Sequence, residues 1–272
     1  MSAGPVVSVR DLRAWYRLSM FGVAREVKAV DGVSFEIRSD EIYGLAGESS
    51  SGKSTLVKTI AGAMRPPLEV VGGEIAFSFM AGTGGLHLAP PEVVAQVRWR
   101  HLSYVMQGSM SVLNPVRRVR ASFVDFAFRH MGLDRAGFDA AVVAHLARVN
   151  LGASVLDAYP HELSGGMRQR VTIALATICR PKFVIADEPT TALDVVVQKD
   201  VLGMFRGIQR EMASSVLFVT HDMGVHAHLT DRLGIMYAGR IVEEARTADL
   251  FARPRHPYTR HLIESLPRIG DD

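Results

Sequence analysis

The chain has 272 residues, 48% of them hydrophobic, which is enough to bury the core of one large α/β domain or of a core domain with a smaller companion. Its net charge is +3, and no run of like charges stands out, which excludes a basic nucleic-acid-binding arm, so we expect no nucleic-acid partner. Cys179 is the single cysteine, which excludes an internal disulfide, and there is neither a signal-peptide start nor an apolar stretch of about 18 residues. We therefore expect a cytoplasmic protein that acts at a membrane only through partners.

Alternating apolar and polar residues near the N-terminus predict strands. Turns are expected at Asp31–Gly32 and Ser39–Asp40, because Asp, Ser and Gly favour turns. The predicted strands are VVSVRDL (6–12), KAVDGVSFEIR (28–38) and EIYGLAG (41–47).

A helix is predicted directly after the third of these strands. The run STLVKTIAGAM (54–64) has helical apolar spacing and ends before Pro66–Pro67, which would break a helix. The stretch GESSSGKST (47–55) therefore lies between a strand and a helix.

The rest of the chain alternates between helical and strand patterns. The periodicity from about 108 to 171 is mostly helical. After it come a strand, FVIADE (183–188), a helix, VVVQKDVLGMFRGIQREM (195–212), and a strand, SSVLFVTHD (214–222). This alternation predicts an α/β fold with a parallel sheet, into which the helical block is inserted.

The residues Gly47-x-x-x-x-Gly52-Lys53-Ser54 match the phosphate-loop pattern. The backbone N–H groups of such a loop surround the β- and γ-phosphates of a nucleotide. Lys53 adds a positive charge to the same oxygens, and the Ser54 hydroxyl is placed to bind Mg²⁺. We expect ATP and Mg²⁺ to be bound here. The other residues of the expected loop are Glu48, Ser49, Ser50, Ser51 and Thr55.

Ser50 stands where the closest pattern prefers a glycine. A glycine is needed only where φ is positive or where a side chain would strike the phosphate. We expect Ser50 to have a negative φ and to carry no strain, so that Ser50→Gly changes the ATP affinity by less than about threefold.

Two carboxylates follow the buried strand of FVIADE. They lie at its carboxyl end, where open α/β sheets bind ligands. Asp187 is predicted to hold Mg²⁺, largely through water, and Glu188 to polarise the attacking water.

These motifs, in their order and spacing, resemble those of ABC-transporter ATPases over nearly the whole chain. The five that carry the resemblance are GESSSGKS (47–54), YVMQ (104–107), LSGGMRQR (163–170), ADEPTTALD (186–194) and FVTHD (218–222). Further stretches resemble the oligopeptide/dipeptide/nickel importer branch, in which two sister ATPases usually work together, and GGMRQR and IADEPTTALD look more like the D-type than the F-type sister. Those stretches are SVLNP (111–115), YPHELSGGMRQR (159–170), IADEPTTALDVVVQ (185–198), MYAGRIVE (236–243) and HPYT (256–259).

The resemblance implies a fold and its divisions. It implies a P-loop NTPase core of the ABC ATPase type, α/β with a mixed or parallel sheet, an antiparallel β subdomain and an inserted helical subdomain. Residues 1–107 and 172–248 are expected to form the nucleotide-binding core, 108–171 the helical subdomain with the signature motif, and 249–272 a short C-terminal HPYT segment.

The resemblance also implies roles for residues outside the loop. Gln107 would touch Mg²⁺ and the attacking water, and His221 would contact the γ-phosphate. Ser164, Gly165 and Gly166 would open a helix, beginning MRQRV, whose N-terminus faces the ATP of the opposite subunit.

Two further positions concern the dimer interface and the adenine. Asp194 would lie across the dimer interface. Tyr16 matches the aromatic residue that stacks on adenine, and Trp15 remains its rival for this role.

By this resemblance the chain is the ATP-hydrolysing subunit of an ABC importer at the cytoplasmic face of the membrane. Its expected partners are a second, F-type ATPase, two membrane permease subunits and an extracytoplasmic solute-binding protein. Peptides, nickel and oligosaccharides are all open as substrates. The alternatives are a soluble ABC ATPase of DNA repair or translation, and a subunit that binds nucleotide but hydrolyses it weakly.

Overall fold

The computed structural model describes residues 4–20, 23–80, 85–106, 112–190 and 194–266. The chain divides into two compact units: Met1–Val94 with Ser215–Asp272, and Ala95–Ser214. The first unit joins the two ends of the sequence, and the second is a continuous segment between them. Both predicted limits of the helical block, 108 and 171, fall within the second unit.

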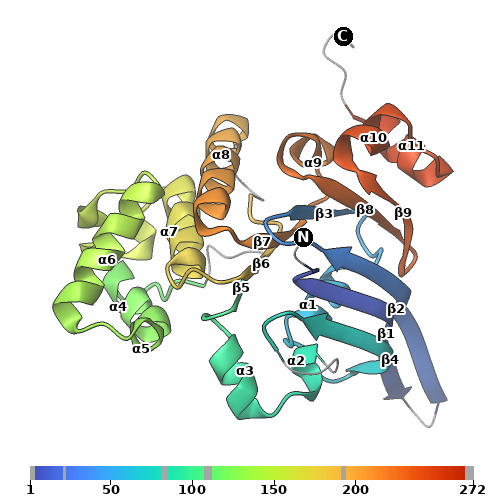
Figure 1. Ribbon diagram of the computed structural model, residues 1–272, viewed down its shortest axis with the longest axis horizontal. Helices are drawn as coiled ribbons and strands as arrows, with labels where there is room; N and C mark the ends of the chain where they lie inside the picture. The colour runs from blue at the N-terminus through green and yellow to red at the C-terminus, as the bar shows by residue number, and fades with distance from the viewer. Residues whose placement is uncertain (1–3, 21–22, 81–84, 107–111, 191–193, 267–272) are drawn as a thin grey trace. The chain divides into compact units, whose positions relative to one another are not determined.

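An antiparallel sheet of three strands forms one part of the first unit (Figure 1). Its order is β2 (Val23–Ile37), β1 (Val7–Met20), β4 (Leu68–Phe77). Val7 of β1 pairs with both neighbours, Ile37 and Phe77. The predicted antiparallel β subdomain is confirmed.

The predicted turn at Asp31–Gly32 is wrong, because β2 runs through it. The pairing between β1 and β2 shifts register there: Leu12 pairs with Val33 but Arg13 pairs with Asp31. Gly32 is thus the extra residue of a β-bulge, and its φ of 80° is one that glycine adopts without strain. The signal that suggested a turn marks a bulge within a longer strand.

A second set of strands in the first unit contains three parallel strands and one antiparallel strand. β3 (Ile42–Ala46) lies between β7 (Ser215–Val219) and β8 (Arg232–Tyr237), and β9 (Arg240–Arg246) pairs antiparallel with β8. All five residues of β3 are buried, as in a strand covered on both faces. The phosphate-loop stretch follows the carboxyl end of β3 directly.

The helix after the phosphate-loop stretch, α1, spans Lys53–Ile60 and is shorter than predicted. Gly62, with a φ of 62°, ends it. The N–H of Gly62 donates to the carbonyl of Thr59 at 3.2 Å and that of Ala63 to the carbonyl of Lys58 at 2.8 Å, which is the bonding of a Schellman motif. The glycine, and not the later prolines, terminates the helix.

Shorter helices complete the first unit. They are α2 (Gly85–Leu88), α9 (Met223–Leu229), α10 (Thr247–Ala252) and α11 (Pro257–Glu264), while α3 (Pro91–Val97) crosses the division between the units.

The second unit is mainly helical, with a pair of parallel strands, β5 (Leu102–Val105) and β6 (Phe183–Asp187). The predicted strand at 183–188 and helix at 195–212 are both confirmed.

The helices of the second unit follow one another along the chain. They are α4 (Val119–Phe123), continued by the π-helical turn η2 (Val124–Phe128) and α5 (Arg129–Met131), then α6 (Arg135–Arg148), the short 3₁₀ turns η3 (Ala153–Asp157) and η4 (Pro160–Glu162), α7 (Gly165–Thr177) and α8 (Val195–Met212).

Each unit buries one histidine in a hydrogen-bonded position. In the first unit, His226 Nε2 lies 3.1 Å from the carbonyl oxygen of Thr220. In the second, His145 Nε2 lies 2.9 Å from Thr177 Oγ1. Burial lowers the pKa of both imidazoles to about 4, because the charged form loses its hydration.

Mild acid should therefore destabilise the protein. The unfolded chain binds protons at these histidines near pH 6.5 and the folded chain does not until about pH 4, so stability falls as the pH drops through this window. Between pH 6.5 and pH 5 we expect a loss of about 1.5 kcal/mol per histidine. Urea unfolding at several pH values measures it, and the fall should be less steep in His145→Gln. A flat stability profile across this window would contradict the prediction.

Candidate functional site

Both glycines of the phosphate loop are needed because backbone oxygens of other segments lie close to their Cα atoms. Gly47 and Gly52 have φ values of 148° and 107°. A Cβ on Gly47 would lie 2.2 Å from the carbonyl oxygen of Met236, and one on Gly52 would lie 2.1 Å from that of Ala29. Neither position accepts a side chain without moving backbone.

Lys53 folds back over this loop. Its ammonium donates to the carbonyl oxygens of Gly47 at 2.6 Å and Glu48 at 2.8 Å, and to Ser51 Oγ at 3.4 Å. The side chain is buried, so the charge is held at the loop. This places a positive charge where the pattern requires one.

The N-terminus of α1 offers backbone donors to an anion. Gly52 occupies the N-cap, and no side chain caps the helix there. The N–H of Leu56 donates to the carbonyl of Gly52 at 2.9 Å, so the N–H groups that precede it point out of the helix end. Together with Lys53 and the helix dipole, these donors fit a phosphate group.

The backbone conformation of Ser50 differs from the one expected from the sequence. Its φ is 68°, in the left-handed region, where the expectation was a negative value. The glycine preferred at this position in related loops has a conformational reason, because a non-glycine residue there costs about 1–2 kcal/mol. Asp40 also has a positive φ, of 59°.

Asp187 ends β6 and is held by a residue that the sequence analysis missed. Its side chain is 3% exposed, and Tyr104 of β5 donates its hydroxyl to Asp187 Oδ2 at 3.2 Å. Burial and the neighbouring carboxylate both raise the pKa of Tyr104, so the phenol stays protonated as a donor. Tyr104 belongs to the stretch YVMQ, in which only Gln107 was predicted to have a role. Gln107 lies outside the described residues.

Glu188 follows in a left-handed conformation with a φ of 48°. Its side chain is half-buried. Non-glycine residues in this region store strain of about 1–3 kcal/mol, and such strain concentrates at functional sites.

The motif after Leu163 starts α7. Ser164 is its N-cap, and its Oγ accepts the N–H of Met167 at 3.2 Å. The helix begins at Gly165, two residues earlier than the expected MRQRV. A Cβ on Gly166 would lie 2.7 Å from a Val197 methyl of α8, so this glycine also permits the close packing of the two helices.

Asp194 caps α8 in the same manner. Its Oδ1 accepts the N–H of Val197 at 2.9 Å, and the residue is exposed. His221, in the first unit, is exposed and lies two residues after the end of β7.

The two candidate aromatic residues have different surroundings. The hydroxyl of Tyr16 lies 3.3 Å from Thr55 Oγ1, in the first turn of α1. Trp15 instead lies under Lys28, whose Nζ is 4.7 Å from the ring centroid. Tyr16 is thus the aromatic residue that contacts the phosphate-loop helix through a described hydrogen bond.

The first unit contains Tyr16, the phosphate loop and His221, and the second contains the signature residues, Asp187, Glu188 and Asp194. The predicted magnesium ligands Ser54 and Asp187 thus belong to different units. In the described part of the chain, no three His, Cys, Asp or Glu side chains cluster as a metal site.

Two family models match this chain. The model of the family described as ABC transporter matches residues 30–191, and that described as oligopeptide/dipeptide transporter, C-terminal region, matches residues 242–272. The chain belongs to the ABC transporter family.

Relatives resemble this ABC ATPase over most of their length. A Brucella ovis protein named as a peptide import ATP-binding protein is 41% identical over 278 residues, covering 100% of this chain and 80% of its own length. The dipeptide transport ATP-binding protein DppD of Bacillus subtilis is 38% identical and covers 97% of this chain and 77% of its own length. The oligopeptide transport ATP-binding protein OppD of Bacillus subtilis is also 38% identical, and the match covers 97% of this chain and 72% of OppD.

Solved structures support the fold. The ATP-binding cassette MJ0796, in a dimeric post-hydrolysis state bound to ADP and Pi, superposes with a TM-score of 0.75 at 22% identity, covering 89% of this chain and 98% of that chain. The predicted ABC ATPase fold is therefore confirmed. Among the described residues of this ABC ATPase, no helix is long and apolar enough to cross a membrane.

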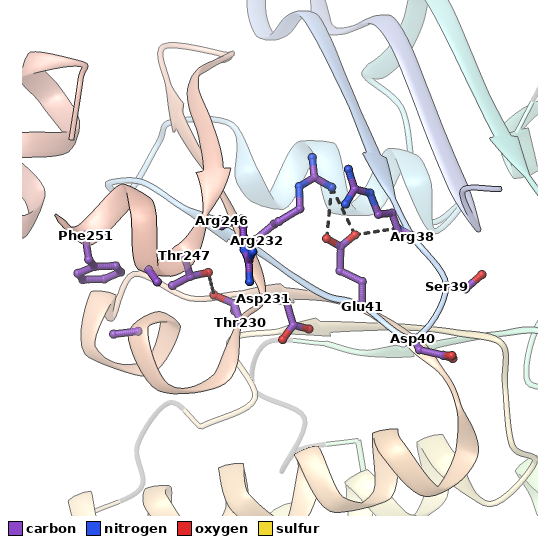
Figure 2. A pocket seen from close by; sticks show the side chains of 12 residues that line it. Arg38, Ser39, Asp40, Glu41, Thr230, Asp231, Arg232, Arg246, Thr247 and Phe251 are labelled. Atoms are coloured by element: carbon purple, nitrogen blue, oxygen red, sulfur yellow. Dashed lines mark hydrogen bonds and ion pairs between the residues drawn. The ribbon is translucent and has the colours of Figure 1, made fainter. Parts of the chain in front are cut away.

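A pocket of about 600 Å³ in this ABC ATPase lies away from the phosphate loop (Figure 2). Its residues surround the amino end of β3, and the loop follows the carboxyl end, about 16 Å along the strand. Glu41, 7% exposed, lies 3.3 Å from Arg232, which also pairs with Glu244. Ile42 donates its N–H to Asp231 at 2.8 Å. These contacts connect the start of β3 with the start of β8 and with β9.

The left-handed Ser50 predicts that this ABC ATPase gains stability from a glycine. Ser50→Gly should relieve about 1–2 kcal/mol of strain in the folded state. It should also lower the stability by about 0.4–1 kcal/mol, because a glycine gives the unfolded chain more conformational entropy. We expect a net gain of up to about 1.5 kcal/mol in the free energy of unfolding, measured by urea denaturation, with the ATP affinity changed less than about threefold.

Ser49→Gly is the matched control, because Ser49 does not have a positive φ. It should lower the stability by about 0.4–1 kcal/mol. Equal losses in the two variants would show that Ser50 carries no strain.

Proposed function

We propose that this chain is the ATP-hydrolysing subunit of an ABC importer that takes up peptides or a related solute. The observation that carries the proposal is the phosphate loop, with Lys53 held over it, in a chain whose C-terminal part matches the oligopeptide/dipeptide transporter region. The names of the bacterial relatives favour an importer over a soluble ATPase of DNA repair or translation.

The loop residues bind and orient ATP. The N–H groups at the start of α1 and the Lys53 ammonium bind the β- and γ-phosphates. Tyr16 stacks on the adenine; its hydroxyl already contacts Thr55 in α1. Ser54, Gln107 and Asp187 would hold Mg²⁺, which neutralises charge developing on the transferred phosphoryl group.

Hydrolysis requires a water molecule positioned in line with the γ-phosphate. Glu188 polarises this water as it attacks, and His221 contacts the γ-phosphate and maintains the geometry. Tyr104 positions the Asp187 carboxylate through its hydroxyl. The left-handed backbone of Glu188 fixes the direction in which its carboxylate leaves β6.

A second ATPase subunit completes each site. The N-terminus of α7, with Ser164, Gly165 and Gly166, faces the γ-phosphate held by the opposite subunit, and Asp194 lies at the interface between them. The D-type resemblance makes an F-type sister the expected second chain. ATP binding closes this dimer and hydrolysis reopens it.

The dimer works at the cytoplasmic face of the membrane. The helical subdomain (108–171) passes its motion to two membrane permease subunits, which receive the solute from an extracytoplasmic binding protein. The nucleotide-binding core comprises 1–107 and 172–248, and 249–272 form the C-terminal segment.

Co-expression tests this assignment. The tagged chain is expressed with its candidate sister ATPase and membrane subunits, and ATP hydrolysis is measured for the chain alone and for the purified complex. We expect a stable complex and a higher rate per chain within it. A chain that hydrolyses ATP at its full rate alone and co-purifies with no membrane subunit would contradict the proposal.

A further inference from the structure

The C-terminal segment contacts the phosphate loop directly. The N–H of Glu48, the second residue of the loop, donates to the hydroxyl of Tyr258 at 2.8 Å. Tyr258 belongs to the HPYT motif, 210 residues further along the chain. Neither the loop pattern nor the proposed catalytic residues give this tyrosine a role.

A set of hydrogen bonds holds Tyr258 in place. The carboxylate of Glu243, in β9, accepts the N–H groups of Arg255 at 2.8 Å and His256 at 2.9 Å. His256 is the N-cap of α11, and its Nδ1 accepts the N–H of Tyr258 at 3.2 Å. These bonds fix the start of α11, so the backbone of Tyr258 is connected to Glu243 of β9 through His256.

The turn between β8 and β9 supports the same loop. Gly239 donates its N–H to the carbonyl of Ser51 at 2.9 Å, and Met236 lies so close to Gly47 that a Cβ there would strike its carbonyl oxygen at 2.2 Å. The Tyr237 and Tyr258 rings are 4.5 Å apart between centroids. The loop thus rests on the β8–β9 turn and is held at Glu48 by Tyr258.

Apolar contacts connect this support to the residues around the site. Tyr258, Leu262 and Ile263 pack on a buried cluster that includes Ala46 and Met223. Ala46 immediately precedes the phosphate loop, and Met223 is two residues beyond His221. The C-terminal segment therefore packs against both chain segments that lead to the proposed γ-phosphate contacts.

We propose that Tyr258 is a positioning residue for ATP: its hydroxyl holds the Glu48 end of the phosphate loop, and through it the HPYT segment sets the affinity for the nucleotide. This inference rests on the proposed function of the loop. It goes beyond it by giving the C-terminal segment a part in nucleotide binding. A tyrosine that served packing alone would need its ring but not its hydroxyl.

Tyr258→Phe separates these two roles, because it keeps the ring and removes only the hydroxyl. In the full-length chain we expect the Kd for ATP to rise about three- to tenfold, the fold-change that one neutral hydrogen bond of ordinary strength produces. In the assembled transporter the KM for ATP should rise by a similar factor with little change in kcat. Hydrogen exchange at the Glu48 amide should become faster without nucleotide.

Tyr237→Phe is the matched control. It removes a hydroxyl from the neighbouring ring, for which no hydrogen bond is described, and Tyr237 is 48% exposed. It should leave both the Kd for ATP and the exchange of the Glu48 amide at parental values. Urea denaturation of each variant without nucleotide measures any loss of stability as a lower midpoint concentration.

An unchanged Kd in Tyr258→Phe, with a parent that binds ATP, overturns the inference and leaves the proposed function intact. Equal rises in the Kd for Tyr258→Phe and Tyr237→Phe, together with equal losses of stability, overturn it as well, since general packing then explains the effect. A parent chain that does not bind ATP overturns the proposed function and this inference together.

Discussion

Glu188→Gln is expected to slow ATP turnover by about 10²–10⁴-fold while ATP still binds. An amide cannot polarise water as a carboxylate does, and the substitution changes little else. Glu188 lies directly after Asp187 at the end of β6, on a backbone with a φ of 48° that a glutamine of the same shape can keep. Phosphate release from the assembled transporter measures the turnover, and ATP titration of the same sample measures binding.

Glu264→Gln, an exposed substitution at the end of α11, controls for the loss of one negative charge and should leave turnover unchanged. Near-parental hydrolysis in Glu188→Gln would remove this residue from the catalytic role. It would also leave the left-handed strain at the position without a functional explanation.

Lys53→Ala is expected to weaken ATP binding in this chain's own loop by about 10- to 100-fold, because a charged hydrogen-bond donor to phosphate is lost. The same change removes the three bonds that the ammonium makes to the loop. Lys58→Ala, on an exposed position of the same helix, is the matched control and should bind ATP normally.

Ser164→Arg tests the other half of the arrangement in a complex with the sister ATPase. The arginine would stand at the start of α7, where the sister's γ-phosphate is expected. The chain's own loop should still bind ATP, and hydrolysis at the sister's site should fail. Loss of ATP from the chain's own loop in Ser164→Arg would contradict the division of each site between two subunits.

The sequence predicted those features that depend on local patterns. The order of strand, phosphate loop and helix follows from apolar periodicity together with two glycines, and both glycines proved to lie against backbone oxygens. The buried strand before Asp187 and the helix over 195–212 were equally clear, since long periodic runs leave few alternatives.

Features that depend on pairing between distant segments were not predictable. Gly32 marks a bulge and not a turn, because only the register against β1 distinguishes the two. The contacts of Tyr104 with Asp187 and of Tyr258 with Glu48 join residues 83 and 210 positions apart. No spacing rule in a single sequence connects such positions.

Backbone conformation was the other source of error. Ser50 was expected to have the negative φ that local preference favours, and its φ is positive instead. The phosphate-loop pattern had signalled this case, since a glycine is preferred at position 50, but its physical reason became clear only from the φ value.

Uptake of a labelled peptide into proteoliposomes tests most directly whether this chain uses ATP to drive solute import. The vesicles contain the chain, its sister ATPase and the membrane subunits, with ATP and the nucleotide-binding faces on one side and the binding protein with peptide on the other. We expect uptake that requires ATP and is lost in Glu188→Gln. Uptake that proceeds equally with Glu188→Gln in this chain, or ATP hydrolysis that a transported solute and its binding protein never stimulate, would contradict it.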